Sequence, residues 1–194
     1  MRKNSFFALL ARTKYIIRWG LMRNSRPENL AEHSLEVAQL AHALAVIGNR
    51  RLGKSYDLGE VALCAIYHDA SEILTGDLPT PIKYYNAQMR ESYKKIEKTA
   101  QQKLLQTLPD DLRPDYDAIF SMEERSSEVR AIVKAADKLS ALIKCAEEER
   151  GGNKEFATAR KATEEAIKGM NLPEAEIFLK DFFITYEFTL DELK

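Results

Sequence analysis

The stretch Ala65-Ile66-Tyr67-His68-Asp69-Ala70-Ser71-Glu72 places a histidine, an aspartate and a glutamate within two helical turns of an otherwise apolar segment. Residues four apart share a helix face, so we expect His68 and Glu72 to point to one side, with Asp69 beside them. Burying a His-Asp pair costs several kcal/mol unless a metal, a partner or hydrogen bonds satisfy it. The stretch therefore predicts a polar centre inside a helical core.

Helical spacing of apolar residues continues on both sides of this stretch. We expect helices over residues 3–19 (as one or two segments), 29–48, 57–75, 88–107, 110–121, 127–150, 154–170 and 173–188. Two of them open with a capping-box pattern, Asn29 with Glu32 and Asp57 with Glu60. No convincing alternating β pattern appears. The sequence therefore predicts an all-α helical bundle.

Length and composition favour one domain over residues 1–194. The chain has 194 residues and 45% hydrophobic content, enough for one core. A net charge of -1 gives no global reason to expect a nucleic-acid or membrane partner. No window approaches the ~18 apolar residues of a membrane span, so we expect a soluble, cytoplasmic protein. Cys64 and Cys145 lack metal-binding spacing and are interpreted as buried, reduced thiols.

The charge is less even locally, because residues 1–27 contain basic residues and no Asp or Glu. The basic residues are Arg2, Lys3, Arg12, Lys14, Arg18, Arg23 and Arg26. This segment is open to three interpretations: an anion site, a solvated basic face or a transit peptide. Further along the chain, Asp77-Leu78-Pro79-Thr80-Pro81 cannot be helical at its two prolines, so we expect an ordered turn directly after the helix with the His-Asp pair.

Two further residues join the His-Asp pair as candidates. His33 lies in the first turn of an expected helix. Asp137 lies inside an apolar helical pattern, where the alternatives are a salt bridge or a slightly exposed edge position. His42 follows His33 by nine residues, about 180° around the helix, and is interpreted as a surface or packed histidine. His33, His68, Asp69 and Asp137 together suit a divalent metal such as Mn, Co, Fe, Ni or Zn that keeps open positions.

The order of these four residues, H…HD…D, resembles that of the HD-domain metal-dependent phosphohydrolase superfamily, which implies an HD-domain helical bundle. Longer segments resemble the bacterial 5'-deoxynucleotidases of the YfbR type over nearly the whole chain, with the part after about residue 150 least diagnostic. These segments are Ile17-Arg18-Trp19, Leu21-Met22-Arg23-Asn24, Glu32-His33-Ser34-Leu35, Tyr67-His68-Asp69-Ala70-Ser71-Glu72, Thr75-Gly76-Asp77-Leu78-Pro79-Thr80-Pro81, Ile96-Glu97-Lys98 and Lys134-Ala135-Ala136-Asp137.

The resemblance implies removal of phosphate from deoxyribonucleoside 5'-monophosphates, with a divalent metal such as cobalt or manganese, by a homodimer. It also implies roles for individual residues: His33, His68, Asp69 and Asp137 as metal ligands, Glu72 as the catalytic carboxylate, Arg18 and Trp19 as substrate contacts, and Asp77, Leu78, Pro79 and Thr80 as the rest of the nucleotide pocket.

These residue types suit the chemistry, although each has a structural alternative. Glu72 could act as general base, general acid or orienter, or form a buried salt bridge. Arg18 offers a fork of donors that matches a phosphate. Trp19 is equally compatible with core packing. The resemblance suggests that Asp77 accepts a hydrogen bond from the sugar 3'-OH beside a wall that excludes a 2'-OH.

Two other classes of function stay open at this stage. One is an HD-domain enzyme that acts on another nucleotide: a cyclic nucleotide, a nucleoside triphosphate or an alarmone. The other is a helical binding or scaffold protein with a structural metal, although such a site would need neither Glu72 nor Arg18. A nucleic-acid-binding bundle is less expected, because the basic residues concentrate in residues 1–27.

Overall fold

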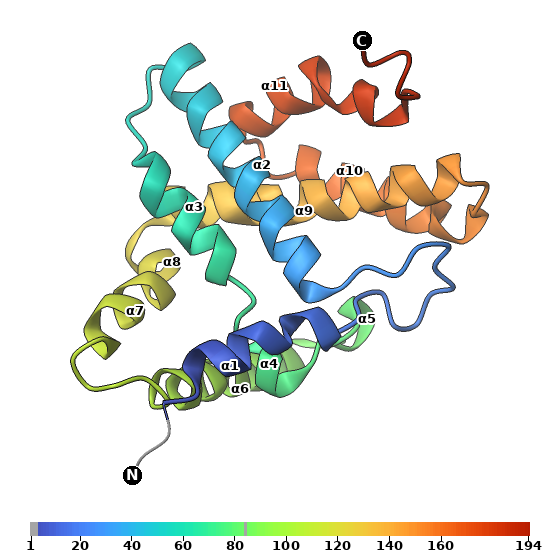
Figure 1. The fold of residues 1–194 in the computed structure, drawn as a ribbon. Helices are drawn as coiled ribbons and strands as arrows, with labels where there is room; N and C mark the ends of the chain where they lie inside the picture. The colour runs from blue at the N-terminus through green and yellow to red at the C-terminus, as the bar shows by residue number, and fades with distance from the viewer. Residues whose placement is uncertain (1–3, 84) are drawn as a thin grey trace.

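The computed structural model describes residues 4–83 and 85–194, so Arg2 and Lys3 of the basic segment lie outside the described residues. Helices and loops make up this part of the chain (Figure 1). Its one pairing of extended backbone is an isolated antiparallel bridge between Ile17 and Asn29. The predicted all-α class is confirmed.

The helices follow the sequence patterns, with several boundaries moved. They are α1 (Phe6–Leu10), α2 (Leu30–Arg51), α3 (Leu58–Tyr67), α4 (Glu72–Thr75), α5 (Thr80–Lys83), α6 (Ala87–Leu105), α7 (Arg113–Phe120), α8 (Met122–Arg125), α9 (Ser127–Arg150), α10 (Ala157–Lys168) and α11 (Pro173–Asp181), with 3₁₀ helices η1 (Ala11–Tyr15), η2 (Lys154–Phe156) and η3 (Phe183–Glu187). In the described residues, no helix is long and apolar enough to cross a membrane.

Helices α2, α3 and α9 form the centre of the bundle (Figure 1). Helix α10 packs against α9, and α11 packs against α2. Helix α2 starts at Asn29, whose side chain accepts the amides of Ala31 and Glu32, while the Glu32 side chain accepts the Asn29 amide. This capping box fixes the first turn of α2. The apolar faces of the three helices share one core, which includes Leu44 and Leu139.

A second apolar cluster joins α1 and α6 to the end of α3. Its buried members are Phe6, Ala70, Leu104, Leu105 and Leu108. Ala70 belongs to this cluster, whereas Ala65, one turn earlier, belongs to the central core. The stretch between these two residues therefore crosses the boundary between the two apolar clusters. At such a boundary a polar centre can be enclosed by apolar residues and still be accessible to a ligand.

The single helix predicted over 57–75 is wrong, because it is broken after Tyr67. Residues 68–71 form a turn, and α4 begins at Glu72. The His68 ring nitrogen Nδ1 lies 2.7 Å from the carbonyl oxygen of Ala65, the acceptor that the next helical turn would use. The following amides bond three residues back, from Glu72 to Asp69 at 2.9 Å. His68 and Glu72 thus do not share one continuous helix face.

The expectation that both prolines after α4 are non-helical is wrong for Pro81. Pro79 precedes the short helix α5, but Pro81 lies in its first turn. The first turn of a helix needs no amide donor from its own residues, so proline fits there. The carbonyl oxygen of Pro79 accepts the amides of Ile82 at 2.8 Å and Lys83 at 3.0 Å, which closes the turn.

Candidate metal centre

Four side chains from three parts of the fold converge on one point. His33 comes from the first turn of α2, His68 and Asp69 from the turn after α3, and Asp137 from the middle of α9. One ligand atom from each lies within 4.8 Å of all the others. The structure therefore brings together all four residues that the sequence nominated, and His42 is exposed elsewhere on α2.

The contacts among the four are close but not arranged as ordinary hydrogen bonds. Nε2 of His33 lies 3.3 Å from Oδ1 of Asp137 and 3.7 Å from Oδ2 of Asp69, and Nε2 of His68 lies 3.0 Å from that same Oδ2. Both Nε2 atoms are buried, and neither has a hydrogen-bond partner in the described residues. Two imidazole nitrogens and two carboxylates thus face one another in a small space.

The outer nitrogen of each imidazole has a hydrogen-bond partner. Nδ1 of His68 must donate to the Ala65 carbonyl, because a carbonyl oxygen can only accept. Nδ1 of His33 lies 3.0 Å from the hydroxyl oxygen of Ser140. Hydrogen bonds at the outer nitrogen are typical of metal-binding histidines, and a set of two imidazoles and two carboxylates fits a divalent transition metal.

The electrostatics of the centre also favour a cation. Burial alone would lower the pKa of His68, but Asp69 and Asp137 outweigh it and raise that pKa to about 9. Burial would raise the pKa of both carboxyls, yet His68 holds the pKa of Asp69 well below its usual range, and His33 lowers the pKa of Asp137 to about 2. The ionised carboxylates thus stabilise positive charge beside the imidazoles. A bound metal ion would provide such a positive charge.

Glu72 lies outside this group of four, in the first turn of α4. Its side chain is 2% exposed, and burial, reinforced by Asp69 and Asp77, raises its pKa to about 9. Oε1 of Glu72 lies 3.8 Å from Nζ of Lys83, while Oε2 is buried and has no hydrogen-bond partner among the described residues. The carboxyl group therefore favours its protonated form at neutral pH.

Arg18 and Trp19 lie beside the start of α2, where the bridge at Ile17 holds the chain. The Arg18 guanidinium is 3.6 Å from Asp69 and 3.6 Å from Glu28. Trp19 has φ of 60°, which is strained for a bulky residue. Its indole N–H donates to Glu28 at 2.7 Å, and its ring packs against Phe156 at 5.3 Å, so the core-packing alternative describes part of its surroundings.

The segment Asp77 to Thr80 follows α4 directly, with Asp77 half-buried and Thr80 exposed. The Asp77 carboxylate is near enough to raise the pKa of Glu72 and to favour the charged form of Arg18. The segment therefore lies near the same centre and near Arg18.

A cleft of about 630 Å³ is lined by residues of α6 and α9 and also by His68, Asp69 and Asp137, so it reaches the centre. Its basic lining residues are Lys83, Arg90, Lys94, Lys95, Lys98, Arg130 and Lys134. Three of them pair with lining carboxylates, Lys83 with Glu97, Lys95 with Glu91 and Lys98 with Glu124. A basic, concave surface attracts anionic ligands. None of these basic residues was predicted from the sequence as a site residue, although Arg90 with Lys94 and Arg130 with Lys134 are spaced four apart, on one face of their helices.

The chain resembles known proteins over its whole length. The family model described as 5'-deoxynucleotidase YfbR-like matches residues 5–186. A 5'-deoxynucleotidase of Pectobacterium atrosepticum is 51% identical, with 100% of this chain and 97% of that protein covered. The 5'-deoxynucleotidase YfbR of Shigella flexneri is 47% identical, with the same two coverages, 100% and 97%.

Solved structures share the fold at lower identity. An HD-domain phosphohydrolase from Listeria innocua aligns with a TM-score of 0.82 at 22% identity, covering 94% of this chain and 88% of that one. The HD phosphohydrolase of cyanophage S-2L, solved with dA and one catalytic Zn²⁺ ion, aligns with a TM-score of 0.67 at 19% identity, covering 94% and 96%. The predicted HD-domain architecture is confirmed.

Proposed function

The chain belongs to the YfbR-like 5'-deoxynucleotidase family, and on that premise we propose that its buried centre hydrolyses deoxyribonucleoside 5'-monophosphates to deoxyribonucleosides and phosphate. One observation supports this most directly: two imidazole Nε2 atoms, which have no hydrogen-bond partner within residues 4–83 and 85–194, face two carboxylates at the end of a basic cleft. A phosphomonoester dianion needs charge neutralisation and an activated water, and this arrangement suits both needs.

The proposed ligands are His33, His68, Asp69 and Asp137. A divalent metal bound there, cobalt or manganese by family resemblance, would supply a Lewis acid for the phosphate and a water of lowered pKa. The hydrogen bond from Nδ1 of His68 to the Ala65 carbonyl keeps the Nε2 atom of this ring available for coordination.

Arg18 is the proposed phosphate clamp. Burial alone would lower its pKa, but Asp137, Asp69 and Glu28 raise it further than burial lowers it, so the guanidinium stays charged. Its Nε is buried without a hydrogen-bond partner among the described residues, which leaves a donor for a phosphate oxygen. A planar fork can donate two hydrogen bonds to one phosphate, which lysine cannot do.

Glu72 is the proposed catalytic carboxyl group. Its raised pKa means that it can carry a proton at neutral pH, as a general acid for the leaving 5' oxygen requires. A residue that only paired with Lys83 would keep its carboxylate ionised, and the 3.8 Å separation is too long for a hydrogen bond.

Trp19 and the segment Asp77, Leu78, Pro79 and Thr80 are the proposed nucleoside contacts. Trp19 follows Arg18 in the chain, the Asp77 carboxylate lies near enough to favour the charged form of Arg18, and Asp77 is the carboxylate that would accept the sugar 3'-OH. A site that hydrogen-bonds the 3'-OH in a fixed position can reject a 2'-OH by steric conflict, which would give deoxyribose selectivity.

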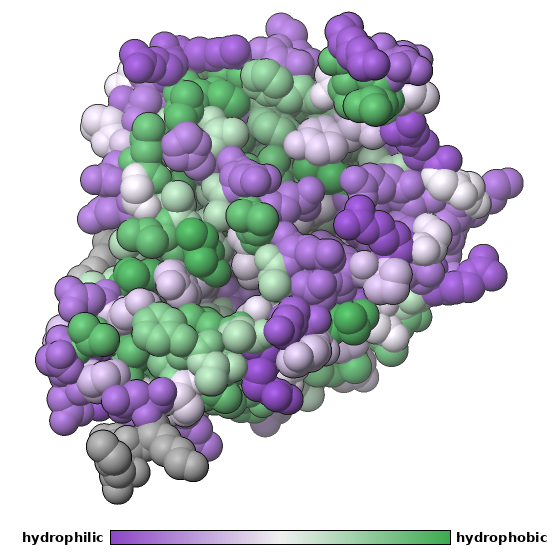
Figure 2. Space-filling model, in the orientation of Figure 1, coloured by the Kyte–Doolittle hydropathy of each residue, from purple (hydrophilic) through white to green (hydrophobic). Residues whose placement is uncertain are grey.

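The family resemblance further suggests that residues 1–194 act as one domain and that the protein is a cytoplasmic homodimer acting on small-molecule nucleotides. Apolar side chains gather on the face over α1 and α3 (Figure 2). Exposed apolar residues of these two helices include Phe7 at 56%, Leu63 at 42% and Ile66 at 43%. A second copy covering this face would remove apolar surface from water.

A metal-reconstituted assay of phosphate release from paired ribo- and deoxyribonucleoside 5'-monophosphates tests the function. We expect hydrolysis of the deoxy substrates, loss of activity with a chelator and recovery with cobalt or manganese. Cyclic nucleotides, nucleoside triphosphates and an alarmone in the same panel test the other HD-domain chemistries. Tight metal binding with no hydrolysis of any phosphoester would contradict the proposed function.

A further inference from the structure

The hydrogen bond that orients His33 continues to a third residue. Nδ1 of His33 lies 3.0 Å from Oγ of Ser140, which donates to Oε2 of Glu36 at 2.6 Å. Ser140 lies on α9 one turn after Asp137, and Glu36 lies on α2 one turn after His33. Ser140 is 0% and His33 1% exposed, so water does not compete for the bond between these two residues.

The donor-to-acceptor direction of these two hydrogen bonds decides which ring nitrogen of His33 carries the proton. A hydroxyl group has one proton, so Ser140, while it donates to an ionised Glu36, can only accept from Nδ1 of His33. The proton of the neutral ring then lies on Nδ1, and the Nε2 lone pair faces Asp69 and Asp137. If residue 36 donated instead, the chain would reverse and the ring proton would lie on Nε2, where it blocks coordination.

Another acceptor near Nδ1 of His33, Oε1 of Glu28, lies at 3.7 Å, which is too long for a hydrogen bond. Within residues 4–83 and 85–194, Ser140 is thus the hydrogen-bond partner that fixes the proton on this ring.

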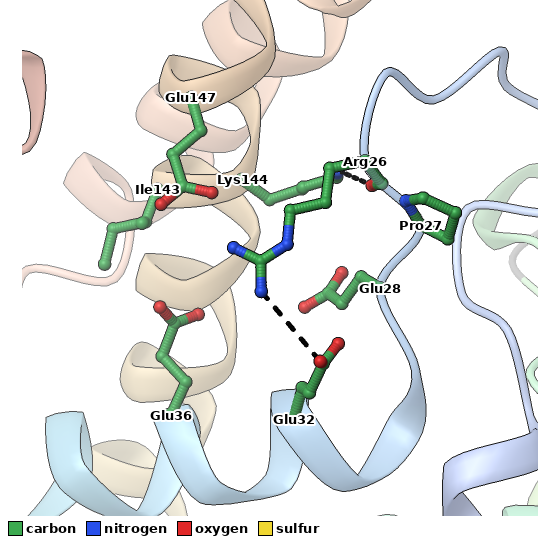
Figure 3. A pocket seen from close by; sticks show the side chains of 8 residues that line it. All are labelled: Arg26, Pro27, Glu28, Glu32, Glu36, Ile143, Lys144 and Glu147. Atoms are coloured by element: carbon green, nitrogen blue, oxygen red, sulfur yellow. Dashed lines mark hydrogen bonds and ion pairs between the residues drawn. The ribbon is translucent and has the colours of Figure 1, made fainter.

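Glu36 borders a separate cavity of about 120 Å³, which is lined by residues of α2, α9 and the loop before α2. Figure 3 shows its carboxylate facing that of Glu147 on α9, with the Arg26 side chain reaching in from the loop before α2. Burial raises the pKa of Glu36, Glu28 and Glu147 raise it further, and the Ser140 hydrogen bond opposes this rise. The residues around this cavity therefore influence the charge of the Glu36 carboxyl group, where the hydrogen bonds from His33 through Ser140 end.

We propose that Ser140 and Glu36 are positioning residues, which hold His33 in its Nδ1-protonated tautomer and thereby set the affinity of the centre for its divalent metal. The proposal rests on the metal binding that the proposed function requires. It assigns these two residues no contact with substrate, so their effect must appear in metal binding before any turnover is measured.

Cobalt titration of the apoprotein tests this, with the visible absorption of bound Co²⁺ and competition against a chromophoric chelator as readouts. Ser140→Ala removes the acceptor, and Glu36→Gln introduces an amide that can donate to Ser140 and reverse the chain. We expect each variant to weaken Co²⁺ binding by about 10-fold or more, as is typical when an outer partner of a metal-binding histidine is lost. Ser140→Thr keeps the hydroxyl group and should bind like the unsubstituted protein.

Two control variants separate the hydrogen bonds from general effects. Glu147→Gln makes the same charge change in the same cavity without touching Ser140, and Ser34→Ala removes a helix hydroxyl that bonds only the Leu30 carbonyl at 2.8 Å. Both should keep the original affinity. Circular dichroism of each apoprotein identifies variants that fail to fold; if Ser140→Thr fails, the comparison of Glu36→Gln with Glu147→Gln decides.

Unchanged Co²⁺ affinity in folded Ser140→Ala and Glu36→Gln would overturn the positioning role. Equal weakening by Glu147→Gln would overturn it too, because the effect would then come from cavity charge. A different failure, absence of divalent-metal binding by the unsubstituted protein, would count against the proposed function itself. The titration distinguishes these outcomes without measuring hydrolysis.

Discussion

Replacing Glu148 by glutamine should destabilise the protein, because this buried carboxylate holds the loop before α2 against α9. Its Oε2 accepts the Ser25 amide at 2.9 Å and the Asn153 side-chain amide at 2.8 Å, and its Oε1 accepts the Arg26 amide at 3.2 Å. The Ser25 hydroxyl and the Lys144 ammonium also donate to it. Glu148 is 2% exposed, so water cannot replace these partners.

The magnitude follows from the hydrogen bonds lost. In Glu148→Gln one oxygen becomes an NH₂ group, which cannot accept, so at least two donors lose their acceptor and Lys144 loses its counter-ion. Hydrogen bonds to a charged group contribute about 1.5–3 kcal/mol each, and breaking a buried ion pair costs about 3–5 kcal/mol. We expect the free energy of unfolding to fall by about 3–5 kcal/mol, which for this chain length lowers Tm by roughly 6–20 °C.

The pH dependence of this stabilisation has a definite sign. The partners of Glu148, above all the Lys144 ammonium, outweigh burial and hold its pKa well below the usual range. A depressed folded pKa gives stability that is fully present above the unfolded pKa of about 4.3 and is lost as the pH falls below it. The unfolding free energies of the original and Glu148→Gln proteins should therefore differ at pH 7 and converge in acid.

Urea unfolding at pH 7 and at a series of pH values below 4.5 measures both effects, with Glu147→Gln, an exposed neighbour, as control. The same loop leads to Glu28, which holds Arg18 and Trp19, so KM for the deoxynucleotide should also rise in Glu148→Gln. A destabilisation below ~1 kcal/mol at pH 7, or one that persists unchanged in acid, would refute the reasoning.

Three further predictions concern the proposed catalytic groups. Glu72→Ala should lower kcat by about 10²–10⁴ while bound metal, measured by elemental analysis, stays at its original level; near-normal turnover would remove Glu72 from the mechanism. Arg18→Lys should lower kcat/KM by about 10²-fold through loss of the two-pronged phosphate contact, and unchanged phosphate release would contradict the clamp. Asp77→Ala should bring the rates on matched ribo and deoxyribo substrates together, whereas an unaltered ratio would place sugar discrimination elsewhere.

The main helices could be predicted because their signals are local. The Asn29 capping box predicted the start of α2, and the long apolar stripe over 127–150 predicted α9 with its observed bounds. Apolar periodicity over 88–107 likewise predicted α6. Such patterns involve residues three or four apart, which meet in any helix whatever its surroundings.

The break between α3 and α4 could not be read from the same patterns. Residues 57–75 have continuous helical spacing, yet the chain turns at His68, whose ring bonds the Ala65 carbonyl and whose Nε2 faces groups from α2 and α9. The turn is favoured by contacts that the His68 side chain makes with residues distant in sequence. The local spacing of apolar residues contains no information about such contacts.

By itself the sequence determined the helical class, the candidate set His33, His68, Asp69 and Asp137, and the family resemblance, because residue type and order carry that information. Only the tertiary structure decided their partners. Ser140 lies 107 residues from His33, and Glu148 lies 123 residues from Ser25. Such pairs form where α9 packs across the start of α2, and no periodicity within one helix specifies which side chains meet there.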